Sequence, residues 1–215
     1  MIRWDDLIHA GRALRKNPGF ATVAILTLAL GIGANTAIFS IINGVLLSPL
    51  PYPDPDRIVA VATFFQQTGR TTPRLTGGDL VDIRADGQIF EALSSYNGGE
   101  MGVQLPGRAE FIGAYMVTAD FFRVFGVHPV YGRLFENSDQ DRAAVISLPF
   151  AERNFGTGAA ALGRAVRIEN RSYEIVGVLP AGFQFPRNGE VWAPAPLTPA
   201  NLDRTAYNYP TVARL

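Results

Sequence analysis

The 215-residue sequence has no cysteine, a single lysine and two histidines. Without cysteine it forms no disulfide and carries out no thiol catalysis, and no Cys/His metal cluster can be assembled. His9 precedes a long apolar run and His128 follows it. Because such a run is expected to cross a membrane, the two histidines would lie on opposite sides of it and cannot share a catalytic site. No Gly-x-x-x-x-Gly precedes Lys16, so a phosphate-binding loop is absent. We expect no cofactor and no enzymatic activity, and we expect another chain to bind any ATP that is used.

Charge is missing from residues 18–53, which contain no Asp, Glu, Lys or Arg. Within them, the apolar run over residues 20–47 would rise about 42 Å as a helix, whereas the hydrocarbon core of a bilayer is about 30 Å thick. We predict a transmembrane helix over 18–48. The alternatives are a secretory signal, whose apolar region is only about 7–15 residues long, and a buried core helix, which rarely runs this long without charge.

The flanking charges predict the orientation of this helix. Four basic and two acidic side chains precede the run, whereas Asp54, Asp56 and Arg57 follow it. Because basic residues favour the cytoplasmic side, the N-terminus is predicted to be cytoplasmic and residues 49–215 periplasmic or extracellular. Residues 1–16 carry a net charge of +2 and residues 54–215 one of −2, so neither part is basic enough to indicate a nucleic acid partner.

The residues before the span have a helical apolar pattern. One face carries Trp4, Leu7, Ile8, Gly11 and Leu14. We predict a cytoplasmic amphipathic elbow helix over residues 1–17 that lies on the inner membrane surface, with a packed cytoplasmic helix as the alternative. Asn17 is predicted to cap the next helix, and Pro18 suits its first turn.

Small residues recur at four-residue intervals in two runs along the predicted membrane helix: Ala29, Gly33, Ala37, Ser40 and Gly44. Such spacing lets a second helix approach closely, and Asn35 and Asn43 would be costly facing lipid. We therefore predict that this helix packs against other helices. The alternative is that small residues are simply tolerated in a passive tether.

The rest of the chain predicts a mixed α+β body. Alternate prolines from Pro49 to Pro55 predict a stiff, extended exit linker over residues 49–56. Beyond it, short apolar runs broken by Gly and Pro indicate one domain or two small lobes over 57–215. No second apolar run reaches the length of a span.

Local patterns predict the elements of this body. Strands are expected over 57–64, 101–105, 110–118, 143–147, 165–169, 173–179, 190–193 and from 212 onward. Helices are expected over 79–86, 88–93, 119–125 and 149–155, the last two ending at Gly126 and Gly156. Asn170-Arg171 reads as a hairpin turn, although turn chemistry favours Gly at the position of Arg171.

Few side chains are candidates for chemistry. Two carboxylate pairs could act as acid and base: Asp79 with Asp82, which would share a helix face, and Asp139 with Asp141. Solvated surface acids explain both pairs more simply, and His128 fits a surface or packing role. Three aromatic residues could line a ligand cleft or pack in the core: Phe121, Phe122 and Phe125. Core packing is the preferred interpretation.

Several stretches, in order, resemble one family. Around the span these are residues 16–20, 28–39 (LALGIGANTAIF), 43–47 and 49–53. In the outer part they are residues 118–122, 126–127, 132–133, 155–156, 162–164, 173–178, 180–183 and 191–192. Over essentially the whole chain, the sequence resembles the MacB-like, or FtsX-like, permeases of ABC transporters.

This resemblance implies a function in the bacterial inner membrane. Such permeases contact membrane lipid, pair with another permease module as a homodimer or a duplicated protein, and transmit ATP hydrolysis by an ABC ATPase subunit to their periplasmic domains. It implies an α+β body of two lobes, one similar to the porter subdomains of efflux pumps and the other small and β-rich. No catalytic residues come with it, and no motif identifies the exported or extracted substrate.

The resemblance also implies that residues 57–215 are incomplete at the C-terminus, because family members continue to three more transmembrane helices. The sequence therefore predicts the N-terminal part of a permease subunit. The alternative is a free-standing, membrane-anchored periplasmic binding module, followed by a membrane-tethered enzyme.

Overall fold

The structure is a computed structural model that describes residues 15–44, 52–87, 89–136, 139, 142–195 and 202–215. The chain divides into two compact units, Met1–Leu50 and Pro51–Leu215, each of which is described by itself. The predicted elbow helix over residues 1–17 lies almost entirely outside the described residues, so it stays a prediction.

The first unit contains the helix α2 (Pro18–Ile42), which begins at the predicted proline. Its 25 residues rise about 38 Å and include an 18-residue stretch with a mean hydropathy of 2.0, so α2 is long and apolar enough to cross a membrane. It is the one such helix in the described part of the chain. The side chain of Asn17 makes no capping hydrogen bond, contrary to prediction; its carbonyl accepts the Ala21 N–H at 3.1 Å.

Residues 52–57, which we call the exit segment, begin the described part of the second unit. Asp54 is left-handed with a φ of 46°, and Pro55–Arg57 form a short 3-10 helix, η2. Proline presets the φ that the first turn of a helix needs, and Asp tolerates the left-handed region. The predicted extended conformation is therefore wrong at residues 54–57.

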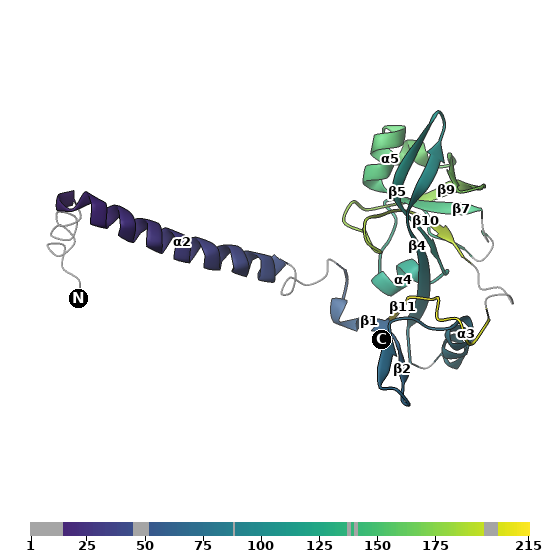
Figure 1. The fold of residues 1–215 in the computed structure, drawn as a ribbon. Coiled ribbons are helices and arrows are strands. Elements are labelled where there is room, and N and C mark those ends of the chain that lie inside the picture. The colour runs from purple at the N-terminus through teal and green to yellow at the C-terminus, as the bar shows by residue number, and fades with distance from the viewer. Residues whose placement is uncertain (1–14, 45–51, 88, 137–138, 140–141, 196–201) are drawn as a thin grey trace. The chain divides into compact units, whose positions relative to one another are not determined.

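The second unit is built on a nine-stranded mixed sheet, which confirms the predicted α+β class. Its order is β1 (Ile58–Val61), β11 (Thr211–Arg214), β4 (Ala92–Leu105), β5 (Arg108–Val117), β10 (Gly189–Pro194), β7 (Ala143–Ser147), β9 (Arg171–Leu179) and β6 (Tyr131–Gly132). The pairs β5–β10 and β7–β9 are parallel. A further strand, β8 (Ala165–Ile168), pairs with both β4 and β9. The pairings β4–β5–β10–β7–β9–β8–β4 therefore close a ring, which we call the strand circuit. Figure 1 labels β4, β5, β7, β9 and β10 of this circuit.

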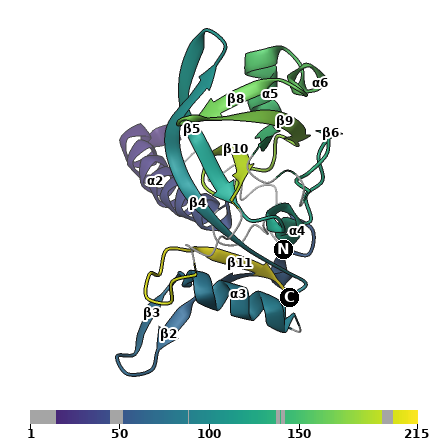
Figure 2. The same cartoon turned by 90° about the vertical axis from the view of Figure 1, so that its right-hand side faces the viewer.

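Strand β4 belongs to two parts of this sheet. Its first residues pair with β11, whereas residues 96–105 pair with β5 along the hairpin. In Figure 2, β4 runs from β11, beside α3 (Gly77–Asp86), to the tip of the β4–β5 hairpin. A separate hairpin joins β2 (Thr63–Phe65) to β3 (Arg70–Thr72). Residues 51–215 form one compact unit, so the predicted division into two lobes stays a prediction.

A buried polar cluster lies where β4 passes from β11 to β5. Ser94 Oγ lies 2.8 Å from Thr118 Oγ1, which also accepts the Ser95 N–H at 3.1 Å. The Thr118 N–H donates to Ser95 O at 3.1 Å. Because a buried polar group without a partner is costly, these bonds hold β4 and the end of β5 together.

The short helices follow local capping signals. The strand over residues 143–147 has its predicted bounds, and α5 (Leu148–Phe155) follows it, with Ser147 Oγ accepting the Phe150 N–H at 3.3 Å. Helix α6 (Gly158–Ala161) begins after Thr157, whose Oγ1 accepts the Ala160 N–H at 3.2 Å. Helix α4 (Phe121–Phe125) ends, as predicted, at a left-handed Gly126 with a φ of 62°.

The predicted helix over residues 88–93 is wrong. Residues 89–91 are not helical, and β4 begins at Ala92. Phe90 and Leu93 nevertheless pack in one cluster with Leu80 and Ile83 of α3. Phe90 and Leu93 follow a helical spacing because they are buried together with residues of α3, and they do not themselves form a helix.

The hairpin between β8 and β9 turns one residue earlier than predicted. Arg171 is the first residue of β9 and pairs with Ile168, so Glu169 and Asn170 form the turn. Glu169 takes the left-handed conformation, with a φ of 52°. Position 171 therefore needs no glycine.

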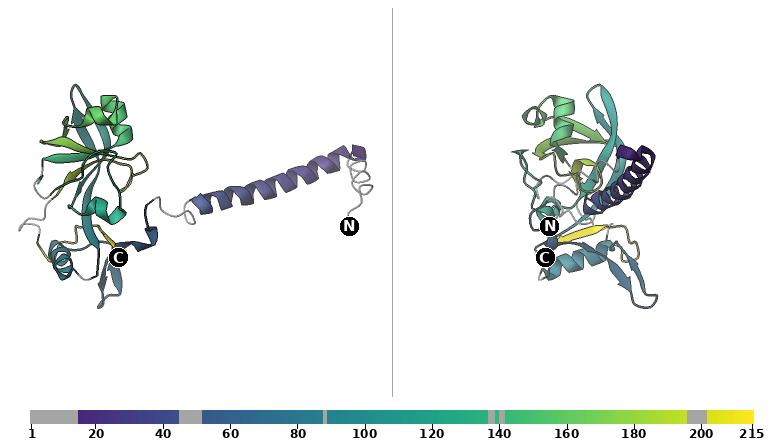
Figure 3. Two further views of the ribbon diagram at one scale, coloured as in Figure 1. Left: turned by 180° about the vertical axis from the view of Figure 1, so that it is seen from behind. Right: turned by 90° about the vertical axis from the view of Figure 1, so that its left-hand side faces the viewer.

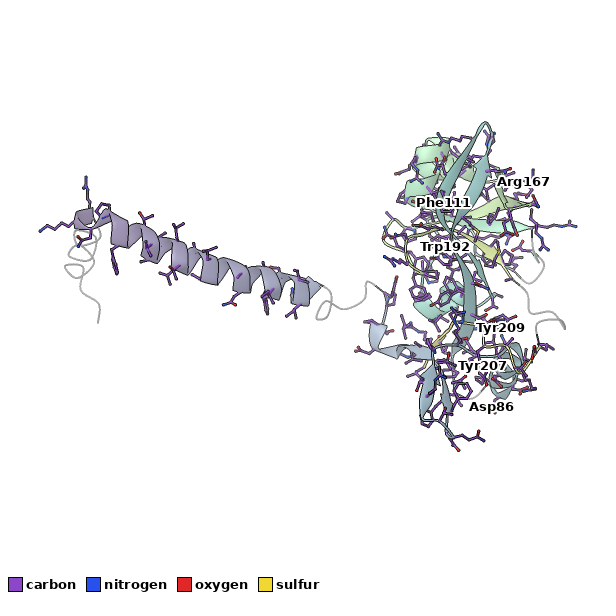
Figure 4. The ribbon with its side chains drawn as sticks, in the orientation of Figure 1. Asp86, Phe111, Arg167, Trp192, Tyr207 and Tyr209 are labelled. Atoms are coloured by element: carbon purple, nitrogen blue, oxygen red, sulfur yellow. The ribbon has the colours of Figure 1, made fainter. Side chains whose placement is uncertain are left out.

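An aromatic cluster fills the core beside the strand circuit: Phe121, Phe122, Phe125, Phe183 and Trp192. The indole N–H of Trp192, labelled in Figure 4, donates to Phe185 O at 3.0 Å. The three phenylalanines of α4 are each at most 2% exposed. They are core residues, so the alternative of a ligand cleft is wrong.

Candidate functional site

The carboxylates on α3 that were candidates for acid–base chemistry are held in ion pairs. Asp79 and Asp82 share one helix face, as predicted, and Arg204 Nη1 lies 3.8 Å from Asp79 Oδ1 and 2.7 Å from Asp82 Oδ2. The hydrogen bond from Arg204 keeps the pKa of Asp82 below its ordinary value. A carboxylate stabilised in its charged form is a poor proton donor, so this pair suits surface ion pairing.

The second carboxylate pair is described only at Asp139, because Asp141 lies outside the described residues. Arg133 donates to Asp139 from Nη1 at 2.7 Å and from Nη2 at 2.8 Å, and it lowers the pKa of that carboxyl. His128 is exposed after α4. Within the described ranges, no group of three His, Cys, Asp or Glu side chains is placed to hold a metal ion. Asp139 is best explained as the structural partner of Arg133.

The most informative arrangement lies at the β1–β11 edge of the sheet. β1 follows the exit segment and β11 is the last strand, yet they pair antiparallel with Ile58 opposite Arg214. The Leu215 N–H donates to Arg57 O at 2.9 Å. The end of β11 therefore lies beside the start of β1, as the position of the C-terminus in Figure 3 shows. A chain that continued past Leu215 would leave where the exit segment arrives.

Arg214 joins three parts of the second unit at this edge, although its side chain is only 7% exposed. Nη1 donates to Pro53 O at 3.1 Å and to Val124 O at 3.2 Å. Nη2 donates to Pro53 O and to Asp54 Oδ2, both at 3.2 Å. Glu91 Oε2 lies 3.8 Å from Nε. A buried charge is tolerated when it is paired and hydrogen-bonded, and these partners meet that condition.

Tyr52 gives the exit segment an apolar contact with the same region. Its ring centroid lies 5.1 Å from that of Phe125 and 5.7 Å from that of Phe183. Burial raises the pKa of the Tyr52 phenol. A Cβ at Gly126 would lie 3.4 Å from Pro53 Cγ, so the end of α4 also touches the exit segment.

The predicted packing residues, four of them in α2 and Gly44 two residues beyond its end, lie along one stripe. On an ideal helix with about 100° per residue, the five predicted packing positions fall within an arc of about 80°: Ala29, Gly33, Ala37, Ser40 and Gly44. All five are exposed, and a Cβ at Gly33 would meet no atom within 4 Å. The stripe is open to a second helix, and its packing role stays a prediction.

Gly132 and Gly177 lie in stretches that resemble the permease family, and close backbone contact between β6 and β9 explains why both are glycine. A Cβ at Gly132 would lie 2.1 Å from Val176 O, and one at Gly177 would lie 2.1 Å from Arg133 O. Real Cβ atoms do not approach backbone oxygens so closely, so only glycine fits both positions.

Sequence reasoning missed both Arg214 and Tyr52 as functional residues. An arginine in a strand pattern reads as a solvent-exposed residue, because charged side chains are rarely buried. Its partner Pro53 is 161 residues away in the sequence, so no local pattern links them. Only the pairing of β1 with β11 brings them together.

Comparison with known families identifies the class of protein. Residues 21–213 match the family described as the MacB-like periplasmic core domain. The chain belongs to this family. No curated protein matches it.

Solved structures share the fold of the second unit. A domain of a protein described as a permease from Porphyromonas gingivalis has a TM-score of 0.63 at 21% identity, over 76% of this chain and 77% of that chain. The periplasmic region of MacB from Actinobacillus actinomycetemcomitans has a TM-score of 0.53 at 14% identity, over 74% of this chain and 72% of that chain. The extracellular domain of the ABC-type transporter YknZ from Gram-positive bacteria has a TM-score of 0.50 at 18% identity, over 74% of this chain and 81% of that chain.

The family defines the class more closely than the fold alone. MacB-like proteins are a permease type of ABC transporter, rather than a classical enzyme, and they work with an ABC ATPase subunit. Together with the apolar helix α2, membership indicates an inner-membrane protein whose second unit is a periplasmic core domain.

Proposed function

We propose that this chain is the N-terminal part of a permease subunit of the MacB or FtsX type. Its N-terminus lies in the cytoplasm, α2 spans the inner membrane, and residues 51–215 lie outside it. ATP hydrolysis by a separate ABC ATPase drives motion of this outer domain, which exports or extracts a substrate. A second permease module, in a homodimer or a duplicated protein, packs beside it within the lipid.

The β1–β11 edge is the observation that carries this proposal. The start of β1 and the end of β11 lie side by side, with the Leu215 N–H bonded to Arg57 O at 2.9 Å. If further membrane helices follow β11, as in the permeases that the sequence resembles, both connections to the membrane are made at one edge. Relative movement of the helices can then tilt the domain as a rigid body. A free-standing binding module needs only one tether, so it makes no use of a second connection at this edge.

The stripe on α2 supports a second module in the membrane. Lipid offers little hydrophobic driving force for association, so helices associate through close packing at small residues. Gly31 provides an internal comparison, because it lies about 160° from the centre of the stripe on an ideal helix. A Cβ at Gly31 or at Gly33 meets no atom within 4 Å, so neither position is constrained by this chain itself.

The test compares Gly33→Leu with the matched control Gly31→Leu in a full-length permease that carries this segment, reconstituted with its ATPase. Both changes keep α2 apolar, so membrane content should stay level. Gly33→Leu places bulk inside the stripe, so dimer recovery and ATP-dependent transport should fall about fivefold or more, while Gly31→Leu stays near the parent. If both variants assemble and transport like the parent, α2 is a passive tether and the binding module becomes the better account.

A further inference from the structure

We propose that Arg214 and Tyr52 fix the exit segment rigidly to the periplasmic domain, so that displacement of the chain arriving from the membrane helix moves α4 and β11 directly. This inference rests on the proposed function, because it names the contacts that carry the movement. The only helix or strand in the exit segment is the short η2, so without such contacts the segment would hinge at its junction with β1 and absorb the movement.

Arg214 holds the backbone of the exit segment rather than its side chains. Pro53 O accepts hydrogen bonds from both Nη1 and Nη2. Val124 O belongs to the last turn of α4, where carbonyls lack partners within the helix, and Nη1 supplies one. The Asp54 side chain is 70% exposed, so its ion pair adds little.

The arginine fork is required for this geometry. Nη1 donates to Pro53 O and Val124 O while Nη2 donates to Pro53 O and Asp54 Oδ2, whereas a lysine ammonium has a single nitrogen and cannot make both sets of bonds. Moving the exit segment away would break the bonds from Nη1 and Nη2 to Pro53 O and the bond to Asp54 Oδ2 together, and would leave donors of a buried guanidinium without partners. The segment therefore follows β11 and α4.

Strand pairing extends the connection into the rest of the sheet. Arg214 O accepts the Glu91 N–H at 2.8 Å, and Arg57 Nη2 donates to Glu91 Oε2 at 2.9 Å. Glu91 directly precedes β4, which continues into the strand circuit. A displacement delivered to Arg214 therefore reaches the strand that runs through the whole domain.

The structural test measures how freely the exit segment moves in the full chain. Because the chain has no cysteine, Asp56→Cys provides a unique attachment site for a nitroxide spin label on an exposed residue of the segment. In lipid nanodiscs the label should be immobilised, and adding Arg214→Lys should raise its mobile fraction about threefold or more. Arg204→Lys is the matched control, because Arg204 is 61% exposed and pairs with Asp82 away from the segment.

A second pair of variants keeps the test decisive if Arg214→Lys fails to fold. Tyr52→Ala removes the ring from the aromatic cluster and should free the label, whereas Tyr52→Phe keeps the ring and should not. A label that is already mobile in the parent, or one that neither Arg214→Lys nor Tyr52→Ala releases, overturns the inference.

A functional measurement separates this inference from the proposed function. In the full-length permease with its ATPase, Arg214→Lys should lower transport per ATP hydrolysed about fivefold, while Arg204→Lys does not. If the segment loosens but transport per ATP is unchanged, these contacts do not carry the movement and the inference is overturned. If the parent itself shows no ATP-dependent transport, the proposed function fails, and the label measurement still decides whether the segment is fixed.

Discussion

The strand circuit and the β1–β11 edge belong to one sheet but are stabilised by different mixtures of contacts. The circuit encloses fully buried apolar side chains with α5 and α6 against them, including Val103, Ile146, Phe150 and Val166. β1 has no fully buried residue: Ile58, Val59 and Val61 are partly buried and pack against the apolar clusters, and Arg214 adds hydrogen bonds and ion pairs. Apolar packing is non-directional, whereas hydrogen bonds fix position. The part of the domain that meets the membrane connection therefore adds directional contacts to its apolar packing.

The largest expected effect tests whether apolar packing stabilises the strand circuit. Phe150 is fully buried in the core of the circuit, so Phe150→Ala should lower the free energy of unfolding by about 3–5 kcal/mol, measured by urea denaturation. The matched control is Phe111→Ala, because Phe111 is 74% exposed and the change should stay within about 0.5 kcal/mol. Similar costs for the two variants would contradict packing as the main stabilisation of the circuit.

The junction between the two regions should show an intermediate effect. Thr118→Val keeps the shape of the side chain but removes the hydroxyl that bonds Ser94 and Ser95. Leaving those buried groups without a partner should lower the free energy of unfolding by about 1–3 kcal/mol. Thr71→Val, at an exposed position of β3, is the control and should change little. A neutral Thr118→Val would show that the cluster does not hold β4 at the junction.

The smallest effect concerns the ion pair of Asp139 and depends on pH. Because Arg133 lowers the pKa of folded Asp139 below 3.8, its stabilisation is fully present above about pH 4 and is lost as pH falls through the folded pKa. Asp139→Asn should therefore lower the free energy of unfolding near pH 7 by about 1 kcal/mol or less. It should also reduce the further decrease in the free energy of unfolding as the pH falls below about 4. Parallel stability curves for variant and parent between about pH 2 and pH 7 would contradict this role.

The circuit was largely predictable because its signals are local. The apolar run at 143–147 is a buried strand, Ser147 caps the helix that follows, and Gly156 ends it. The motif positions are Gly177, on β9 of the circuit, and Gly132, on the neighbouring β6, where backbone contact between β6 and β9 requires glycine.

The β1–β11 edge was not predictable because its partners are distant in sequence. A strand at the end of the chain was expected, but its position between β1 and β4 was not. The same distance hid Arg214, whose partners lie 90 and 161 residues away. Residues 89–91 were assigned to a helix because their apolar neighbours bury against α3, so a helical spacing appeared without a helix.

The central claim is that the periplasmic domain moves when a separate ATPase changes its nucleotide state. The most direct measurement places a spin label at Phe111→Cys, an exposed site near the tip of the β4–β5 hairpin (Figure 4), in both copies of a full-length permease dimer without other cysteines. Pulsed EPR then compares label-to-label distances in the nucleotide-free and ATP-bound complexes. The account predicts a shift of about 5 Å or more between the two states. Superimposable distance distributions in an actively hydrolysing complex would contradict it.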